Sequence, residues 1–120
     1  MTREVFITGI GIVSNLGEGI EAQLAAVAEG RPGSVAAERF KPHLVHPGVP
    51  LEWERQIPKK SDQRQMEAWQ RLGVYAAGLA LDDAGIKEDK ALLGNLHLIC
   101  AAGGGERDYQ VDSQGLTGLP

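Results

Sequence analysis

The chain has 120 residues, of which 42% are hydrophobic and 23% are charged, a composition typical of a folded globular protein. Its net charge of −4 provides no overall positive field that would attract nucleic acid or an anionic membrane. No apolar stretch approaches the roughly 18 residues of a membrane span, and the first residues do not resemble a signal peptide. We therefore expect a cytoplasmic protein that neither spans a membrane nor binds nucleic acid.

The first third of the chain predicts one strand, one helix and a long loop. Residues 4–8 are β-branched and aromatic and are followed by glycines, which is typical of a buried strand that enters a tight turn. A short helix is predicted between Gly19 and Gly30, because apolar residues recur there at helical spacing and Gly30 can end it. Residues 31–60 contain several prolines and few periodic apolar positions, so a long irregular excursion is expected.

The remainder predicts one long helix and a second buried strand. Apolar residues at helical spacing predict a helix over 62–84, capped by Asp62 and ended by Gly85, with the ring of Trp69 enclosed. Several small residues on this helix would let another backbone approach closely. A strand is predicted at 96–102. The order strand, helix, helix, strand favours an α/β fold in which the two strands are parallel and non-edge members of one sheet.

A dinucleotide-binding turn is the first candidate site. Residues 8–11 read Thr-Gly-Ile-Gly after a predicted strand, but Ser14 stands where the fingerprint requires its third glycine. The acidic residue that would hold the ribose is also misplaced, because Glu29 falls inside the predicted helix. A nicotinamide-dependent, Rossmann-type reductase therefore stays a minor alternative.

Other polar residues have simpler structural interpretations. His43 and His46 have no third ligand nearby and are interpreted as a solvated loop pair, not a metal site. Cys100, the single cysteine, excludes an internal disulfide, and its predicted strand position favours a buried, inert role. Asp82 and Asp83 point about 100° apart on a helix, so they are expected to form a solvated rim and not a facing acid/base pair. No residue is assigned to a catalytic step, a metal or a cofactor.

Three segments together resemble the β-ketoacyl-[acyl carrier protein] synthases. Residues 5–17 resemble the opening strand and glycine loop of that family, although Asn15 stands where proline is usual. Residues 62–85 resemble its next signature, an alanine-rich helix that ends in Asp-Ala-Gly. Residues 98–105 sit where the family has a strand that runs into a glycine-rich turn. The resemblance implies that residues 1–120 are the amino-terminal part of a thiolase-like layered α/β fold, incomplete in this chain.

The resemblance also implies an activity and partners. Such enzymes condense an acyl thioester with malonyl-carrier protein, with loss of carbon dioxide, in fatty acid biosynthesis, and they form homodimers. The family's catalytic cysteine and two histidines are expected beyond the end of this chain, so the chain alone should be inactive. The open alternative is a non-catalytic relative that only binds a carrier protein.

Two groups of residues are candidate sites within this family. Lys59, Lys60 and Arg64 form a basic group in an acidic chain, and the resemblance implies that they dock the acidic acyl carrier protein. Gly103 and Gly104 lie where related enzymes limit the depth of the acyl pocket, so glycine there is expected to favour long acyl chains.

Overall fold

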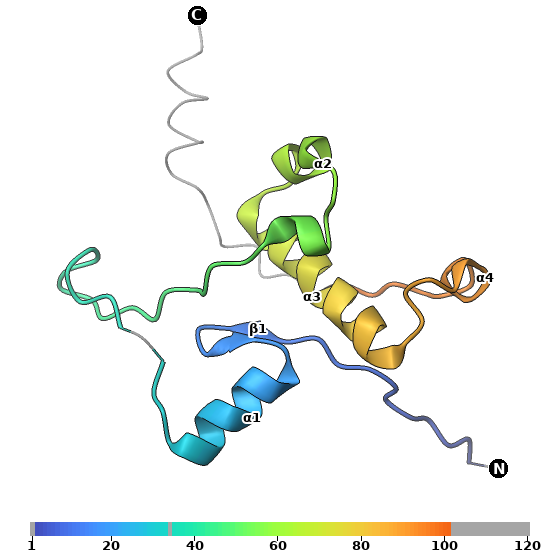
Figure 1. Cartoon of the computed structure of the whole chain (residues 1–120), viewed down its shortest axis with the longest axis horizontal. Helices are drawn as coiled ribbons and strands as arrows, with labels where there is room; N and C mark the ends of the chain where they lie inside the picture. Colours follow the sequence, from blue (N-terminus) through green and yellow to red (C-terminus); the bar gives the residue numbers. More distant parts are fainter. Residues whose placement is uncertain (1, 34, 102–120) are drawn as a thin grey trace, which may run out of the picture.

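Most of the regular secondary structure is helical in the part of the chain that the computed structural model describes, residues 2–33 and 35–101, and long irregular segments join the helices (Figure 1). The chain combines four α-helices with one two-stranded sheet in this part, so the predicted mixture of helix and sheet is present but the sheet is small. No helix in these residues is long and apolar enough to cross a membrane. The elements in chain order are β1 (Val13–Ser14), β2 (Gly17–Glu18), α1 (Ile20–Glu29), the 3-10 helix η1 (Trp53–Arg55), α2 (Lys60–Gln65), α3 (Ala68–Ala84) and α4 (Lys90–Leu93).

The strands β1 and β2 form a short antiparallel hairpin that lies beside α1 (Figure 1). The hydroxyl of Ser14 accepts the backbone N–H of Leu16 at 3.1 Å and donates to Oε1 of Gln23 at 2.6 Å. The amide of Gln23 in turn donates to the carbonyl of Gly17 at 2.9 Å. One glutamine of α1 therefore ties the helix to both strands of the hairpin.

The two predicted buried strands are not strands in the described part of the chain. Residues 4–8 and 96–101 are extended, yet neither segment pairs with another strand among the described residues. Their apolar side chains are exposed, with Val5 at 89% and Ile99 at 93%. Extended backbone becomes a strand only when a neighbour takes up its hydrogen bonds, and no such neighbour is found in residues 2–33 and 35–101. The predicted parallel, non-edge pair is therefore wrong here.

The predicted close approach to the long helix is confirmed. Gly9 and Gly11 lie directly against α3, where a Cβ on Gly9 would come within 2.7 Å of Cβ of Ala84. A Cβ on Gly11 would come within 2.6 Å of the backbone nitrogen of Ala80 and would also meet the carbonyl oxygen of Ala76. Alanines at i, i+4 and i+8 thus present one smooth face of α3, and the extended amino-terminal segment packs on it.

The predicted helix over 62–84 is in fact two helices. The backbone of Met66 is extended, with φ −101° and ψ 140°, so α2 ends at Gln65. A new helix begins after Glu67, whose backbone N–H donates to Oε1 of Gln70 at 2.8 Å, as in a capping box. The predicted end is correct, since Gly85 adopts the left-handed conformation with φ 72° that ends α3.

Burial also differs from the prediction at several side chains. Trp69 is 38% exposed, and its Nε1 donates to Oε2 of Glu67 at 2.6 Å, so the expected enclosure is wrong. The bounds of α1 match the prediction, but its Val27 is 75% exposed. The buried apolar residues in the described part of the chain are Ala26, Ile57 and Tyr75.

Candidate functional site

The three predicted docking cations lie together at α2, and all three are exposed. Lys59 is the residue before the helix, Lys60 is its first residue, and Arg64 lies one turn later. Nζ of Lys60 is 3.7 Å from Oε1 of Glu54, a distance at which an exposed ion pair contributes little. Within residues 2–33 and 35–101, neither Lys59 nor Arg64 forms an ion pair. We call Lys59, Lys60 and Arg64 the basic cluster; its charges are available to an anionic partner.

The segment that precedes the basic cluster is fastened to α3 through Gln56. The amide of Gln56 donates to Oδ2 of Asp82 at 2.8 Å, and its Oε1 accepts a hydrogen bond from Nζ of Lys87. The same side chain lies against Gly78, where a Cβ would collide with it. The hydrogen bond from Gln56, aided by Lys87, lowers the pKa of Asp82 below its ordinary value. Asp82 is thus an anchor for this segment and not merely part of a solvated rim.

A second connection joins the hairpin, η1 and α3. Tyr75 of α3 is fully buried, and its hydroxyl donates to Oε2 of Glu18 at 2.5 Å. Nη1 of Arg55 lies 2.8 Å from the other carboxylate oxygen of Glu18. The ring of Trp53 meets that of Tyr75 edge-on, with centroids 5.7 Å apart. Burial raises the pKa of Tyr75, and the hydrogen bond to Glu18 raises it further, so this phenol acts as a hydrogen-bond donor and not as a base.

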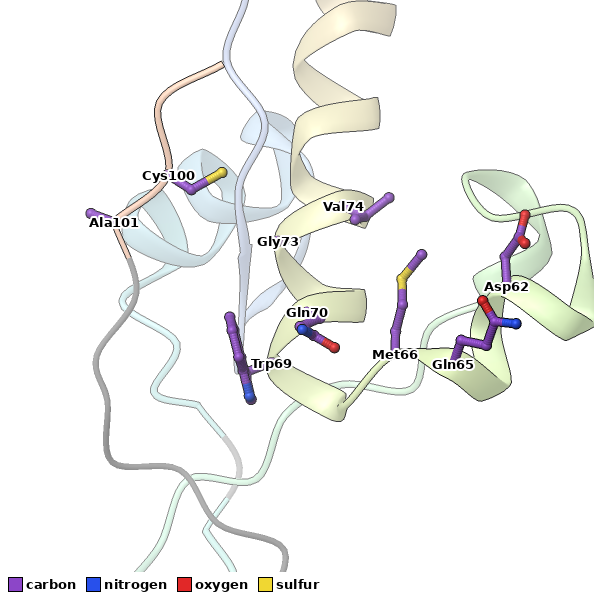
Figure 2. A pocket seen from close by; sticks show the side chains of 9 residues that line it. All are labelled: Asp62, Gln65, Met66, Trp69, Gln70, Gly73, Val74, Cys100 and Ala101. Atoms are coloured by element: carbon purple, nitrogen blue, oxygen red, sulfur yellow. The ribbon is translucent and has the colours of Figure 1, made fainter.

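A shallow groove of about 530 Å³ runs between the end of α2, the first half of α3 and residues 100–101 (Figure 2). Figure 2 shows α2 set off from α3, with Met66 on the connection between them. Cys100 lines this groove and is exposed, so its predicted burial is wrong. No histidine lines the groove, so no imidazole base stands among its lining residues to activate the thiol. The lining residues are Asp62, Gln65, Met66, Trp69, Gln70, Gly73, Val74, Cys100 and Ala101.

The glycine motif near the amino terminus has a packing role. A dinucleotide-binding turn must lead into a helix whose amino terminus faces the phosphates, but here the chain runs into the β1–β2 hairpin. Gly9 and Gly11 pack on α3 instead. Between them, the backbone N–H of Ile10 donates to Oδ2 of Asp83 at 2.9 Å, so Asp83 also has a structural partner.

The remaining predicted sites are not brought together by the structure. His43 lies in a turn, where its N–H donates to the carbonyl of Phe40 at 2.8 Å. No group of three potential metal ligands exists in the part of the chain that the structure describes. Gly103 and Gly104, the predicted acyl-pocket residues, lie outside the described residues.

Sequence reasoning missed the residues that hold the site in place. Gln56 and Asp82 are 26 positions apart, and Tyr75 and Glu18 are 57 apart, so no local pattern marks either pair. The break between α2 and α3 did carry a local signal, because Glu67 and Gln70 have the spacing of a capping box.

The chain is similar to one curated protein, the 3-oxoacyl-[acyl-carrier-protein] synthase 2 of Vibrio harveyi. The two are 30% identical over 89 residues, which cover 71% of this chain and 21% of that relative. The predicted resemblance to the β-ketoacyl synthases is confirmed. The chain spans about a fifth of the length of this synthase. No protein-family model matches the chain. No solved structure matches it significantly either.

Proposed function

We propose that this chain is part of a β-ketoacyl-[acyl carrier protein] synthase, which condenses an acyl thioester with malonyl-carrier protein and releases carbon dioxide. Two features of the sequence support this assignment: the three motifs occur in the family's order, and the chain is similar to a 3-oxoacyl-[acyl-carrier-protein] synthase. The complete protein is expected to act in the cytoplasm as a homodimer, as the family resemblance implies.

The basic cluster is the observation that carries the proposal for this part of the protein. Lys59, Lys60 and Arg64 are exposed at a helix that is separate from α3, in a chain whose net charge is −4. Lys59 and Lys60 stand at the start of α2, where cations oppose the helix dipole, so these two do not stabilise the helix, whereas Arg64 lies in its last turn. An acidic carrier protein is a partner that such a surface would attract and orient. We therefore assign carrier-protein docking to the basic cluster.

The condensation chemistry itself is assigned to the rest of the protein. The reaction needs a thiolate that takes the acyl group, donors that promote decarboxylation, and amides that stabilise the thioester oxyanion. Cys100 has no histidine beside it in the groove, so it is not assigned as the thiolate. The contribution of this chain is to bind the carrier and, through Gly103 and Gly104, to leave a deep acyl pocket that suits long chains.

An assay of the complete protein tests this proposal. Purified protein is supplied with an acylated carrier and with malonyl-carrier protein, and the release of carbon dioxide and the formation of 3-oxoacyl-carrier are measured. We expect both products in equal amounts. If the protein binds the carrier but forms neither product, the non-catalytic alternative is correct. If it neither binds nor condenses, the assignment is wrong.

A further inference from the structure

The helix that bears the basic cluster is too short to hold its own shape. Helix α2 has six residues, whereas isolated helices below roughly 12 residues are marginal in water. It carries no side-chain cap at its start, and Met66 interrupts it before α3 begins. The position of its cations must therefore be set by contacts with the rest of the chain.

Among the residues that the structure describes, one side chain of α2 supplies such a contact by a hydrogen bond. Gln63 is the single residue of the helix that is not exposed. Its Nε2 donates to the backbone carbonyl of Ile57 at 2.8 Å. No other α2 side chain makes a hydrogen bond to a residue within 2–33 and 35–101. The ion pair between Lys60 and Glu54 is long and exposed, so it holds the helix only weakly.

The acceptor of this hydrogen bond is itself firmly placed. Ile57 is 3% exposed, and its N–H donates to the carbonyl of Trp53 at 2.8 Å. The preceding residue, Gln56, is bound to Asp82 and Lys87 and lies against Gly78 of α3. A continuous path of hydrogen bonds and packing therefore leads from Gln63 to the body of α3.

We propose that Gln63 is a positioning residue for carrier-protein docking: its hydrogen bond to Ile57 holds α2 in the one orientation in which the basic cluster matches the carrier. The inference rests on the proposed function of that cluster. When the hydrogen bond is lost, α2 samples other orientations, and the apparent affinity for the carrier falls in proportion to the fraction that stays in place. Gln63 does not touch the carrier itself.

The test compares Gln63→Met with Gln65→Met in the complete protein. Methionine keeps the length of the side chain and a similar helix propensity but cannot donate to Ile57. Gln65, two positions later, is exposed and donates no hydrogen bond to a described residue, so it is a matched control. We expect Gln63→Met to raise the KM for the carrier-bound substrate about two- to tenfold, the range that corresponds to one net hydrogen bond. Gln65→Met should leave that KM unchanged, and both variants should keep kcat on a small thioester mimic.

Two further readouts separate positioning from general destabilisation and from direct docking. Amide hydrogen exchange at positions 63 and 66 should become faster in Gln63→Met only, because the backbone N–H groups at these positions bond within the α2 segment. The dependence of carrier binding on salt should stay as in the wild type, since all three cations remain. In Arg64→Glu, by contrast, the salt dependence should weaken.

The outcomes distinguish the inference from the proposed function. If Arg64→Glu raises the KM for the carrier substrate but Gln63→Met does not, Gln63 has no positioning role. An equal loss of activity on both the carrier substrate and the small mimic in Gln63→Met would show a general structural role and would also overturn the inference. If Arg64→Glu itself has no effect on the carrier substrate, the docking function of the basic cluster is wrong.

Discussion

The hydroxyl of Tyr75 lies 2.5 Å from Oε2 of Glu18, so a single hydrogen bond joins the middle of α3 to the second strand of the hairpin, 57 positions earlier in the chain. Tyr75 is fully buried, whereas the side chain of Glu18 is 29% exposed and also binds Arg55. The pair therefore has a buried donor and a charged acceptor, an arrangement that makes a strong hydrogen bond.

Replacement of Tyr75 by phenylalanine should remove this bond without opening a cavity. We expect Tyr75→Phe to lower the free energy of unfolding of the complete protein by about 1.5 kcal/mol, the lower end of the range for hydrogen bonds to charged groups. Urea denaturation measures the change. Glu18→Gln, which keeps an acceptor oxygen, should cost less. If Tyr75→Phe is as stable as the wild type, the hydroxyl has no stabilising partner.

The contact between the amino-terminal segment and α3 predicts opposite effects at two glycines. Gly11→Ala would drive a Cβ into the backbone of α3 near Ala80 and should destabilise the protein by about 1–3 kcal/mol. Gly73 lies within α3, and a Cβ there would have no atom within 4 Å. Gly73→Ala should therefore stabilise the protein by up to about 1 kcal/mol, because alanine has the higher helix propensity. Thermal unfolding of both variants gives the sign. Equal changes at the two positions would contradict the packing described.

The hydrogen bonds at Asp82 predict a dependence of stability on pH. The hydrogen bond from Gln56, with the contribution of Lys87, lowers the pKa of Asp82 below its ordinary value, so the folded state favours the ionised carboxylate. The stabilisation that Asp82 supplies is therefore complete above about pH 4 to 5 and is lost as the pH falls through the lowered pKa. In Asp82→Asn, the loss of stability on acidification below about pH 5 should be smaller than in the wild type. If the free energy of unfolding depends on pH identically in the variant and the wild type, the hydrogen bonds to Asp82 do not contribute to stability through its ionisation.

Local sequence signals predicted the carboxyl-terminal ends of α1 and α3 but not the break between α2 and α3. Gly30 and Gly85 both adopt the left-handed conformation that only glycine reaches without strain, and the helices end where they stand. The small residues of α3 also predicted a close backbone neighbour, which Gly9 and Gly11 supply. These features depend on a few adjacent residues or on one helix face, so a single sequence contains the information.

The strands and the anchors of the site could not be predicted in the same way. Whether residues 4–8 form a strand depends on a pairing partner, and none lies in residues 2–33 and 35–101. Gln56 and Gln63 look like ordinary polar residues, because their partners, Asp82 and the carbonyl of Ile57, are known only once the chain is folded. The basic cluster could be recognised in the sequence, but the hydrogen bonds of Gln56 and Gln63 that position it could not.

The central claim, that the basic cluster docks a carrier protein, is tested most directly by Arg64→Glu in the complete protein, with Lys90→Glu as the matched control. Lys90 is also an exposed cation, at the start of α4, and lies outside the cluster. Steady-state kinetics on the carrier-bound substrate and on a small thioester mimic give KM and kcat for each variant. We expect Arg64→Glu to raise the KM for the carrier substrate roughly tenfold at low salt and to leave the mimic unaffected, while Lys90→Glu changes neither. An unchanged KM for the carrier substrate in Arg64→Glu, or an equal rise in Lys90→Glu, would contradict the account.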